Sequence, residues 1–211
     1  MSDGLTSNVL LVIGFAGSGV AGAVVRLAGV AGAVAGAVSM GAGEWVSVSA
    51  QNELVVRELE VERRELAVNA EAEQRELAAM YEGHGMQAAT ARQAAADVMR
   101  DPEAALNVHA REEFGIDPTE LPSAWQAAAV SFVCFVIGAV LPVIPWLVSG
   151  GNGATVASIL IGVVAAAALG WAIGQFAERN RLKSALRQVL IMLGACVITY
   201  SIGKALHVGV S

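Results

Sequence analysis

Five apolar runs, each about as long as a membrane-spanning helix, dominate the sequence. They cover residues 4–25, 28–48, 125–148, 154–176 and 185–206. A helix needs about 20 consecutive apolar residues to cross the hydrocarbon core of a bilayer. The hydrophobic share of 55% and the mean hydropathy of +0.59 are also high for a soluble domain. We therefore expect an all-α membrane protein with five transmembrane helices.

A polar and acidic segment separates the second run from the third. Residues 53–120 hold 16 acidic and 7 basic residues, so the rest of the chain carries a net positive charge. Residues 54–81 contain no Gly or Pro and continue the second run, which predicts one long helix leaving the membrane. Two shorter helices are expected at 86–99 and 103–114, after the breakers Gly83 and Gly85 and after Asp101 with Pro102. The expected domains are residues 1–50, 51–122 and 123–211.

Carboxylates gather on one side of the expected helix 54–81. At about 100° per residue, four glutamates share a face roughly 80° wide, and Glu58 and Met80 fall on the same stripe. Like charges three residues apart repel, so this face gains only if a cation binds there. The alternative is an ordinary solvated face. The four glutamates are Glu62, Glu65, Glu73 and Glu76.

A second group of candidate ligands lies in the expected helix 103–114. His109 and Glu113 are four residues apart, hence on one face, and Glu112 is adjacent. An imidazole and a carboxylate at this spacing can bind one divalent ion. The alternative is a pair of hydrogen-bonded neighbours.

Three residues with unusual chemistry lie in the first two apolar runs: Asp3, Met40 and Glu44. An ionisable group within a membrane span is costly and therefore suggests a function. Met40 and Glu44 are four residues apart on one helix face. The alternative for Asp3 is a helix N-cap at the membrane surface.

The distribution of basic residues predicts the orientation of the chain. Arg179, Arg181, Lys183 and Arg187 lie between the last two apolar runs, which the positive-inside rule assigns to the cytoplasm. Counting back through the spans places the N-terminus and the acidic segment in the cytoplasm as well. Short loops and the lack of targeting signals favour a bacterial plasma membrane over a vacuolar membrane.

Other classes of function are disfavoured. The net charge of −6 argues against a nucleic-acid partner. Cys134 and Cys196 lie inside apolar runs and suggest packing residues. The spans contain no nucleophile with a base beside it, and His207 has no evident partner, so we expect no catalytic residues and no enzyme.

Four motifs together resemble one known family. They are DGLT from Asp3, SMGAGEW at 39–45, HAREEFGI at 109–116 and LPVIPWL at 141–147. With the glutamate-rich helix, they occur in the order found in the vacuolar iron transporter family, which includes nodulin-like and bacterial relatives. The resemblance covers essentially the whole chain. Members of that family carry several more residues before the DGL motif.

The resemblance implies a homodimer with its pore between the subunits, which exports Fe²⁺ from the cytosol in exchange for protons. Mn²⁺ is a second candidate substrate, and no prosthetic group is implied. Asp3 and Met40 match the pore residues. The metal-domain residues correspond to Glu62, Glu65, Glu73, Glu76 and Glu113, while His109 stands where relatives tend to carry Met. The competing hypothesis is a membrane protein that binds or senses metal without transporting it.

Overall fold

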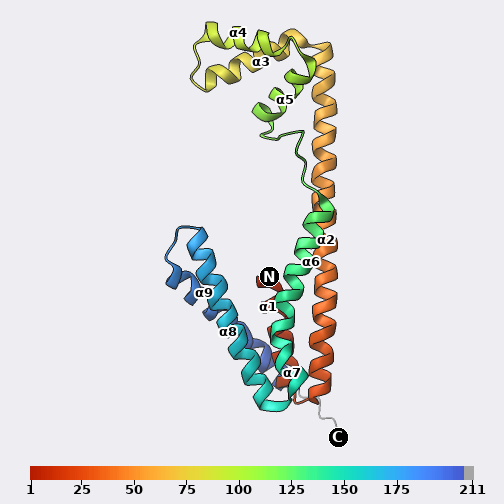
Figure 1. Ribbon diagram of the computed structural model, residues 1–211, viewed down its shortest axis with the longest axis vertical. Helices are drawn as coiled ribbons and strands as arrows, with labels where there is room; N and C mark the ends of the chain where they lie inside the picture. Colours follow the sequence, from red (N-terminus) through yellow and green to blue (C-terminus); the bar gives the residue numbers. More distant parts are fainter. Residues whose placement is uncertain (207–211) are drawn as a thin grey trace. The chain divides into compact units, whose positions relative to one another are not determined.

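The computed structural model describes residues 1–206, which form helices joined by short turns and by one longer non-helical segment at residues 114–123 (Figure 1). His207 lies outside the described residues. Two compact units can be distinguished. The first, here called the apolar unit, comprises Met1–Trp45 and the chain from Trp125 onward. The second, the acidic unit, comprises Val46–Ala124.

The first apolar run does not form a single helix. Helix α1 spans Ser2–Gly17, and α2 begins only at Gly22. Between them Gly19 has a φ of +78°, a backbone conformation that glycine adopts without steric cost. The expected helix over residues 4–25 is therefore wrong at its C-terminal end. At 16 residues, α1 is shorter than the roughly 20 residues that a membrane-spanning helix needs.

Helix α2 runs without interruption from Gly22 to Val68, over 47 residues. This confirms that the second apolar run continues into the acidic segment as one helix. The first half of α2 belongs to the apolar unit and the second half to the acidic unit.

The expected helix 54–81 is wrong at one point, because the chain turns at Asn69. Helix α2 ends at Val68, and α3 spans Ala70–Gly83. Asn69 has a φ of −122°, and its Nδ2 donates to Glu65 Oε2 at 2.6 Å. The turn lets α3 bury Leu77 and Ala78 with Ala95 of α4. Tertiary burial thus outweighs the helical preference of the local sequence.

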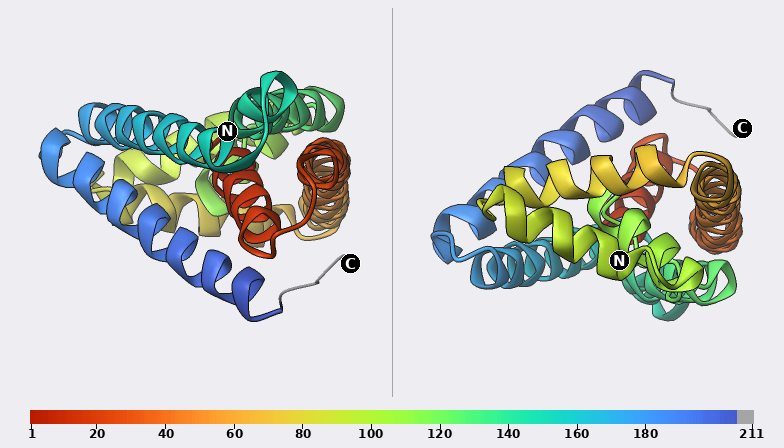
Figure 2. Two further views of the ribbon diagram at one scale, coloured as in Figure 1. Left: turned by 90° about the horizontal axis from the view of Figure 1, so that it is seen from below. Right: turned by 90° about the horizontal axis from the view of Figure 1, so that it is seen from above.

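The remaining helices of the acidic unit lie close to their predicted positions. Helix α4 spans Ala88–Val98 and α5 spans Pro102–Glu113. Asp101 caps α5 by accepting hydrogen bonds from the backbone N–H groups of Glu103 and Ala104. Helices α3 and α4 lie side by side (Figure 2).

The C-terminal part of the apolar unit begins with a kinked helix. Helix α6 spans Ala124–Val140, a single 3₁₀ turn follows at Leu141–Val143, and α7 spans Ile144–Val148. Pro142 and Pro145 lie at this break, as predicted. Ser158 of α8 donates to the carbonyl of Pro142 at this break and accepts from Trp146 Nε1.

Two long antiparallel helices complete the chain. Helix α8 spans Gly151–Phe176 and α9 spans Arg181–Ala205. The basic residues expected in their connection are only partly there. Arg179 lies in the turn, whereas Arg181, Lys183 and Arg187 belong to the first two turns of α9, which Asn180 caps.

Helix α1 is the centre of the apolar unit. It packs between α2 and the α8–α9 pair (Figure 2). Leu5, Val9 and Ile13 are fully buried against Met192 and Cys196 of α9. On its other side α1 meets α2 and α7, where Val12 packs with neighbouring apolar residues. Among the described residues, four helical segments are long and apolar enough to cross a membrane: Gly22–Val68, Ala124–Val148, Gly151–Phe176 and Arg181–Ala205.

Candidate functional site

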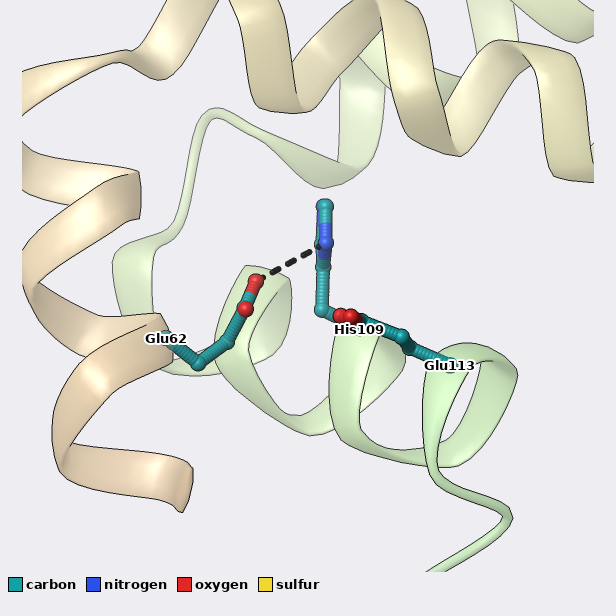
Figure 3. A group of neighbouring side chains, drawn as sticks. All are labelled: Glu62, His109 and Glu113. Carbon is teal, nitrogen blue, oxygen red and sulfur yellow. Dashed lines mark ion pairs between the residues drawn. The ribbon is translucent and has the colours of Figure 1, made fainter. Parts of the chain in front are cut away.

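A cluster of ionisable side chains lies inside the acidic unit, where α2 meets α5. Glu62 comes from α2, and His109 and Glu113 come from successive turns of α5. One ligand atom from each side chain lies within 4.8 Å of the other two. Glu62 Oε1 is 3.0 Å from His109 Nδ1, and the two side chains point toward each other (Figure 3).

The polar atoms of this cluster are buried and poorly satisfied. His109 is 0% exposed and Glu62 is 6% exposed. Neither ring nitrogen of His109 makes a hydrogen bond within the described part of the chain, and Glu62 Oε1 makes none either. The 3.0 Å contact is therefore close in distance without the geometry of a hydrogen bond. Buried polar atoms normally have partners, and a divalent cation could take Glu62 Oε1 and one ring nitrogen of His109 as ligands.

Glu73 of α3 extends the cluster. It is 9% exposed, and its Oε2 lies 3.8 Å from His109 Nδ1. The turn at Asn69 thus brings a glutamate of α3 to the imidazole. The predicted face on one continuous helix does not exist, because the glutamates are divided between α2 and α3. We refer to Glu62, Glu73, His109 and Glu113 as the Glu–His cluster.

Burial and mutual repulsion change the protonation of the Glu–His cluster. Burial, then the charges of Glu113, Glu73 and Glu76, raise the pKa of Glu62 to about 7. Burial is also the main cause that raises the pKa values of Glu73 and Glu113. It lowers the pKa of His109, although Glu76 opposes this effect. The imidazole is consequently neutral at physiological pH and keeps a lone pair for a metal ion.

The other acidic-unit candidates lie at the edge of the cluster or outside it. Glu76 and Glu58 are exposed, yet their charges raise the pKa of Glu113, so both lie near it. Glu65 accepts the hydrogen bond from Asn69 at the corner between α2 and α3. Met80 is half-buried, one turn beyond Glu76. Glu112 faces elsewhere, with its Oε2 3.5 Å from His84 Nδ1.

A groove of about 390 Å³ in the apolar unit brings two of the three predicted pore residues together. We call it the Asp3 groove. Asp3 and Ser7 of α1 line one wall, and Met40 of α2 lines the other. Ser7 Oγ donates to the carbonyl of Asp3 at 2.6 Å. Glu44 lies one turn beyond Met40 and is not part of the lining.

The comparison with known proteins covers nearly the whole chain. The VIT family profile matches residues 1–204. The chain belongs to the VIT family. A relative from Eucalyptus grandis named vacuolar iron transporter 1 is 28% identical over 208 residues, 98% of this chain and 84% of the relative. Vacuolar iron transporter 1 of Arabidopsis thaliana is equally similar, with 83% of its length covered. A vacuolar iron transporter of Acanthamoeba castellanii is 38% identical over 120 residues, 57% of this chain and 45% of the relative.

Membership of the VIT family agrees with the resemblance in the sequence motifs. Together with the apolar helices, it identifies the chain as a multi-pass membrane protein. Sequence reasoning missed one buried polar residue of the Asp3 groove. Asn8 lies inside the first apolar run and lines the Asp3 groove. The signal that could have revealed it is an amide side chain five residues after Asp3, within a segment expected to span the membrane.

Proposed function

We propose that the chain transports Fe²⁺, and also Mn²⁺, out of the cytosol. The observation that carries this proposal is the presence of two different groups of metal-binding side chains in one membrane protein of the VIT family. One is the buried Glu–His cluster of the acidic unit. The other is the groove that joins Asp3 to Met40 in the apolar unit.

In this proposal the Glu–His cluster binds the metal ion on the cytoplasmic side. Carboxylate oxygens with one imidazole nitrogen suit Fe²⁺ and Mn²⁺. A cation would offset the repulsion among the buried carboxylates and accept the lone pair of the neutral imidazole. Glu76 and Glu58 lie near enough to attract the ion electrostatically. Glu65 acts at longer range, because its carboxylate is engaged with Asn69.

The Asp3 groove would then carry the ion through the membrane. A divalent ion that loses its water needs ligands at depth, because low dielectric imposes a large solvation penalty. Asp3 supplies charge and oxygen, and the Met40 thioether supplies a soft, polarizable donor. Both side chains are exposed at the surface of a single copy of the apolar unit. A second copy facing the groove would shield them from lipid and double the ligand set, which supports a homodimer with the pore between its subunits.

Exchange with protons follows from the same arrangement. Two Asp3 carboxylates facing each other across a two-fold axis cannot both ionise easily without metal. At least one would take up a proton when the ion leaves, so metal and proton would alternate. Glu44, one turn beyond Met40, is a candidate to pass that proton onward.

We propose the following orientation of the chain in the membrane. The basic residues at the start of α9 favour the cytoplasmic side for the connection between α8 and α9. The N-terminus and the acidic unit are then cytoplasmic as well. We favour a bacterial plasma membrane over a vacuolar membrane.

The competing function is metal binding or sensing without transport, which the Glu–His cluster alone could perform. Purified protein in sealed liposomes distinguishes the two. A transporter takes up Fe²⁺ and Mn²⁺ faster than empty liposomes do and responds to a pH gradient. Metal binding by the protein without uptake above empty liposomes would favour the sensor.

A further inference from the structure

Asn8 is a polar side chain buried in the centre of the apolar unit, with a relative exposure of 2%. Its Nδ2 donates to the carbonyl of Gly29 in α2 at 3.0 Å and to the carbonyl of Ala139 in α6. Because both partners are carbonyl oxygens, which only accept hydrogen bonds, the NH₂ group of the amide must face them. The orientation of the amide group is thereby fixed, and three helices are tied together.

The carbonyl oxygen of the same amide, in contrast, has no hydrogen-bond partner among the described residues. Asn8 Oδ1 is buried, and none of the described residues donates a hydrogen bond to it. It faces α2 at Gly32, where an added Cβ would lie 2.9 Å from the oxygen. An unsatisfied buried acceptor costs free energy.

The location of the oxygen connects it with the Asp3 groove. Asn8 and Gly32 both line this groove, as do Asp3 and Met40. Along α1, Asn8 lies about 7 Å beyond Asp3, and along α2, Gly32 lies about two turns from Met40. A cation that leaves Asp3 and Met40 along the groove therefore reaches the neighbourhood of Asn8 Oδ1 next.

We propose that Asn8 Oδ1 is a further ligand for the divalent cation in the Asp3 groove, a neutral and hard oxygen that favours Mn²⁺. This inference rests on the proposed transport. An amide oxygen replaces water around the ion without adding a charge that would retain it. Carbonyl oxygens suit Mn²⁺, whereas thioethers suit softer ions. Asn8 and Met40 thus give the groove one hard and one soft neutral ligand beside the Asp3 carboxylate.

A useful test must block the oxygen without removing the two hydrogen bonds of the NH₂ group. Asn8→Leu removes both and can unfold the unit. Gly32→Ala instead places a methyl group 2.9 Å from Oδ1 and leaves Asn8 intact. The same methyl group meets Leu11 Cδ2, so Leu11→Ala is combined with it. Leu11→Ala alone is the direct control. Gly14→Ala in α1, where the nearest atom is 3.7 Å away, is a second control for added volume.

The experiment measures initial uptake of Mn²⁺ and Fe²⁺ into proteoliposomes. Relative to Leu11→Ala, the double variant Gly32→Ala/Leu11→Ala should raise the KM for Mn²⁺ about tenfold and the KM for Fe²⁺ less. Metal binding by the acidic unit should stay unchanged, and a melting temperature that still shows a folded apolar unit should accompany the change in KM. Equal KM values for the double variant and Leu11→Ala would overturn the role of Asn8 and leave transport intact. A wild-type chain that moves neither metal would overturn the proposed function, and this inference with it.

Discussion

The Glu–His cluster and the Asp3 groove differ in how they hold their carboxylates. The cluster buries several carboxylates against one another and against a neutral imidazole, so that the pKa of Glu62 rises to about 7. The groove has one exposed carboxylate, beside a thioether and a serine hydroxyl. Where buried carboxylates repel one another, a bound cation removes the repulsion, so such a site should bind the cation tightly. A single carboxylate with neutral neighbours should bind the cation more weakly and release it more readily.

The largest expected effect belongs to the groove. Asp3→Asn removes its only carboxylate, which a dehydrated divalent ion cannot replace with neutral donors. Uptake of Fe²⁺ into proteoliposomes should fall about 100-fold or more, a loss of roughly 3 kcal/mol of stabilisation. Ser2→Ala is the control, because it leaves the charge of the groove unchanged and removes only the hydrogen bond that Ser2 accepts from Gln188 Nε2. Normal Fe²⁺ uptake by Asp3→Asn under a pH gradient would mean that the groove is not the pathway.

The second prediction concerns the stability of the metal-free acidic unit. Because folding raises the pKa of Glu62 from 4.5 to about 7, the folded state binds this proton more tightly than the unfolded state. The contribution of Glu62 to stability is therefore largest below pH 4.5 and falls as the pH rises to about 7, by up to roughly 3 kcal/mol. His109, whose pKa is lowered, opposes the trend below its unfolded pKa.

Hydrogen exchange of the α5 backbone amides, with a chelator present, measures this stability. The free energy of local opening should decrease between pH 5 and pH 8 in the wild type. Glu62→Gln should remove most of the decrease. A wild-type opening free energy that increases over this range would contradict the assignment of Glu62 as a buried, repelled carboxylate.

The third prediction compares a buried residue of the Glu–His cluster with an exposed glutamate near it. Glu62→Gln should weaken Mn²⁺ binding to the chain about tenfold or more, since it neutralises a buried ligand next to His109. Glu65→Gln is the matched control, because Glu65 is exposed and engaged with Asn69. Its effect should stay below about threefold. Titration calorimetry gives both affinities, and equal losses would favour a diffuse acidic surface over a defined site.

The smallest expected effect is that of the soft ligand in the groove. Met40→Leu keeps the volume of the side chain and removes the sulfur. Fe²⁺ uptake should fall about fivefold, and Mn²⁺ uptake should fall less, because thioethers suit softer ions. Competition between the two metals in the same liposomes measures the change. An unaltered ratio of Fe²⁺ to Mn²⁺ uptake would show that Met40 is a packing residue and not a metal ligand.

Local signals in the sequence predicted most helix boundaries. Asp101 with Pro102 marks the start of α5, and the prolines of the LPVIPWL motif mark the break after α6. These positions are set by backbone chemistry within a few residues. The end of α1 was missed even though Gly19 carries the required signal, because the apolar run continues past it.

The corner at Asn69 could not be predicted in this way. Asn costs little more than its neighbours inside a helix, and what fixes the turn is the burial of Leu77 and Ala78 against α4. The pairing of His109 with Glu113 followed from their spacing, whereas their approach to Glu62 depends on how α5 packs. Asn8 was missed because its partners Gly29 and Ala139 are distant in the sequence.

In the proposed mechanism the acidic unit binds the ion and the Asp3 groove passes it on. This mechanism is tested most directly by measuring equilibrium metal binding and initial Fe²⁺ flux on the same preparations of wild type, Asp3→Asn and Glu62→Gln. We predict that Asp3→Asn retains wild-type affinity in the acidic unit and loses flux. Glu62→Gln should lose affinity in that unit and retain flux at saturating Fe²⁺. Parallel losses of binding and flux in both variants would contradict the division between the two regions.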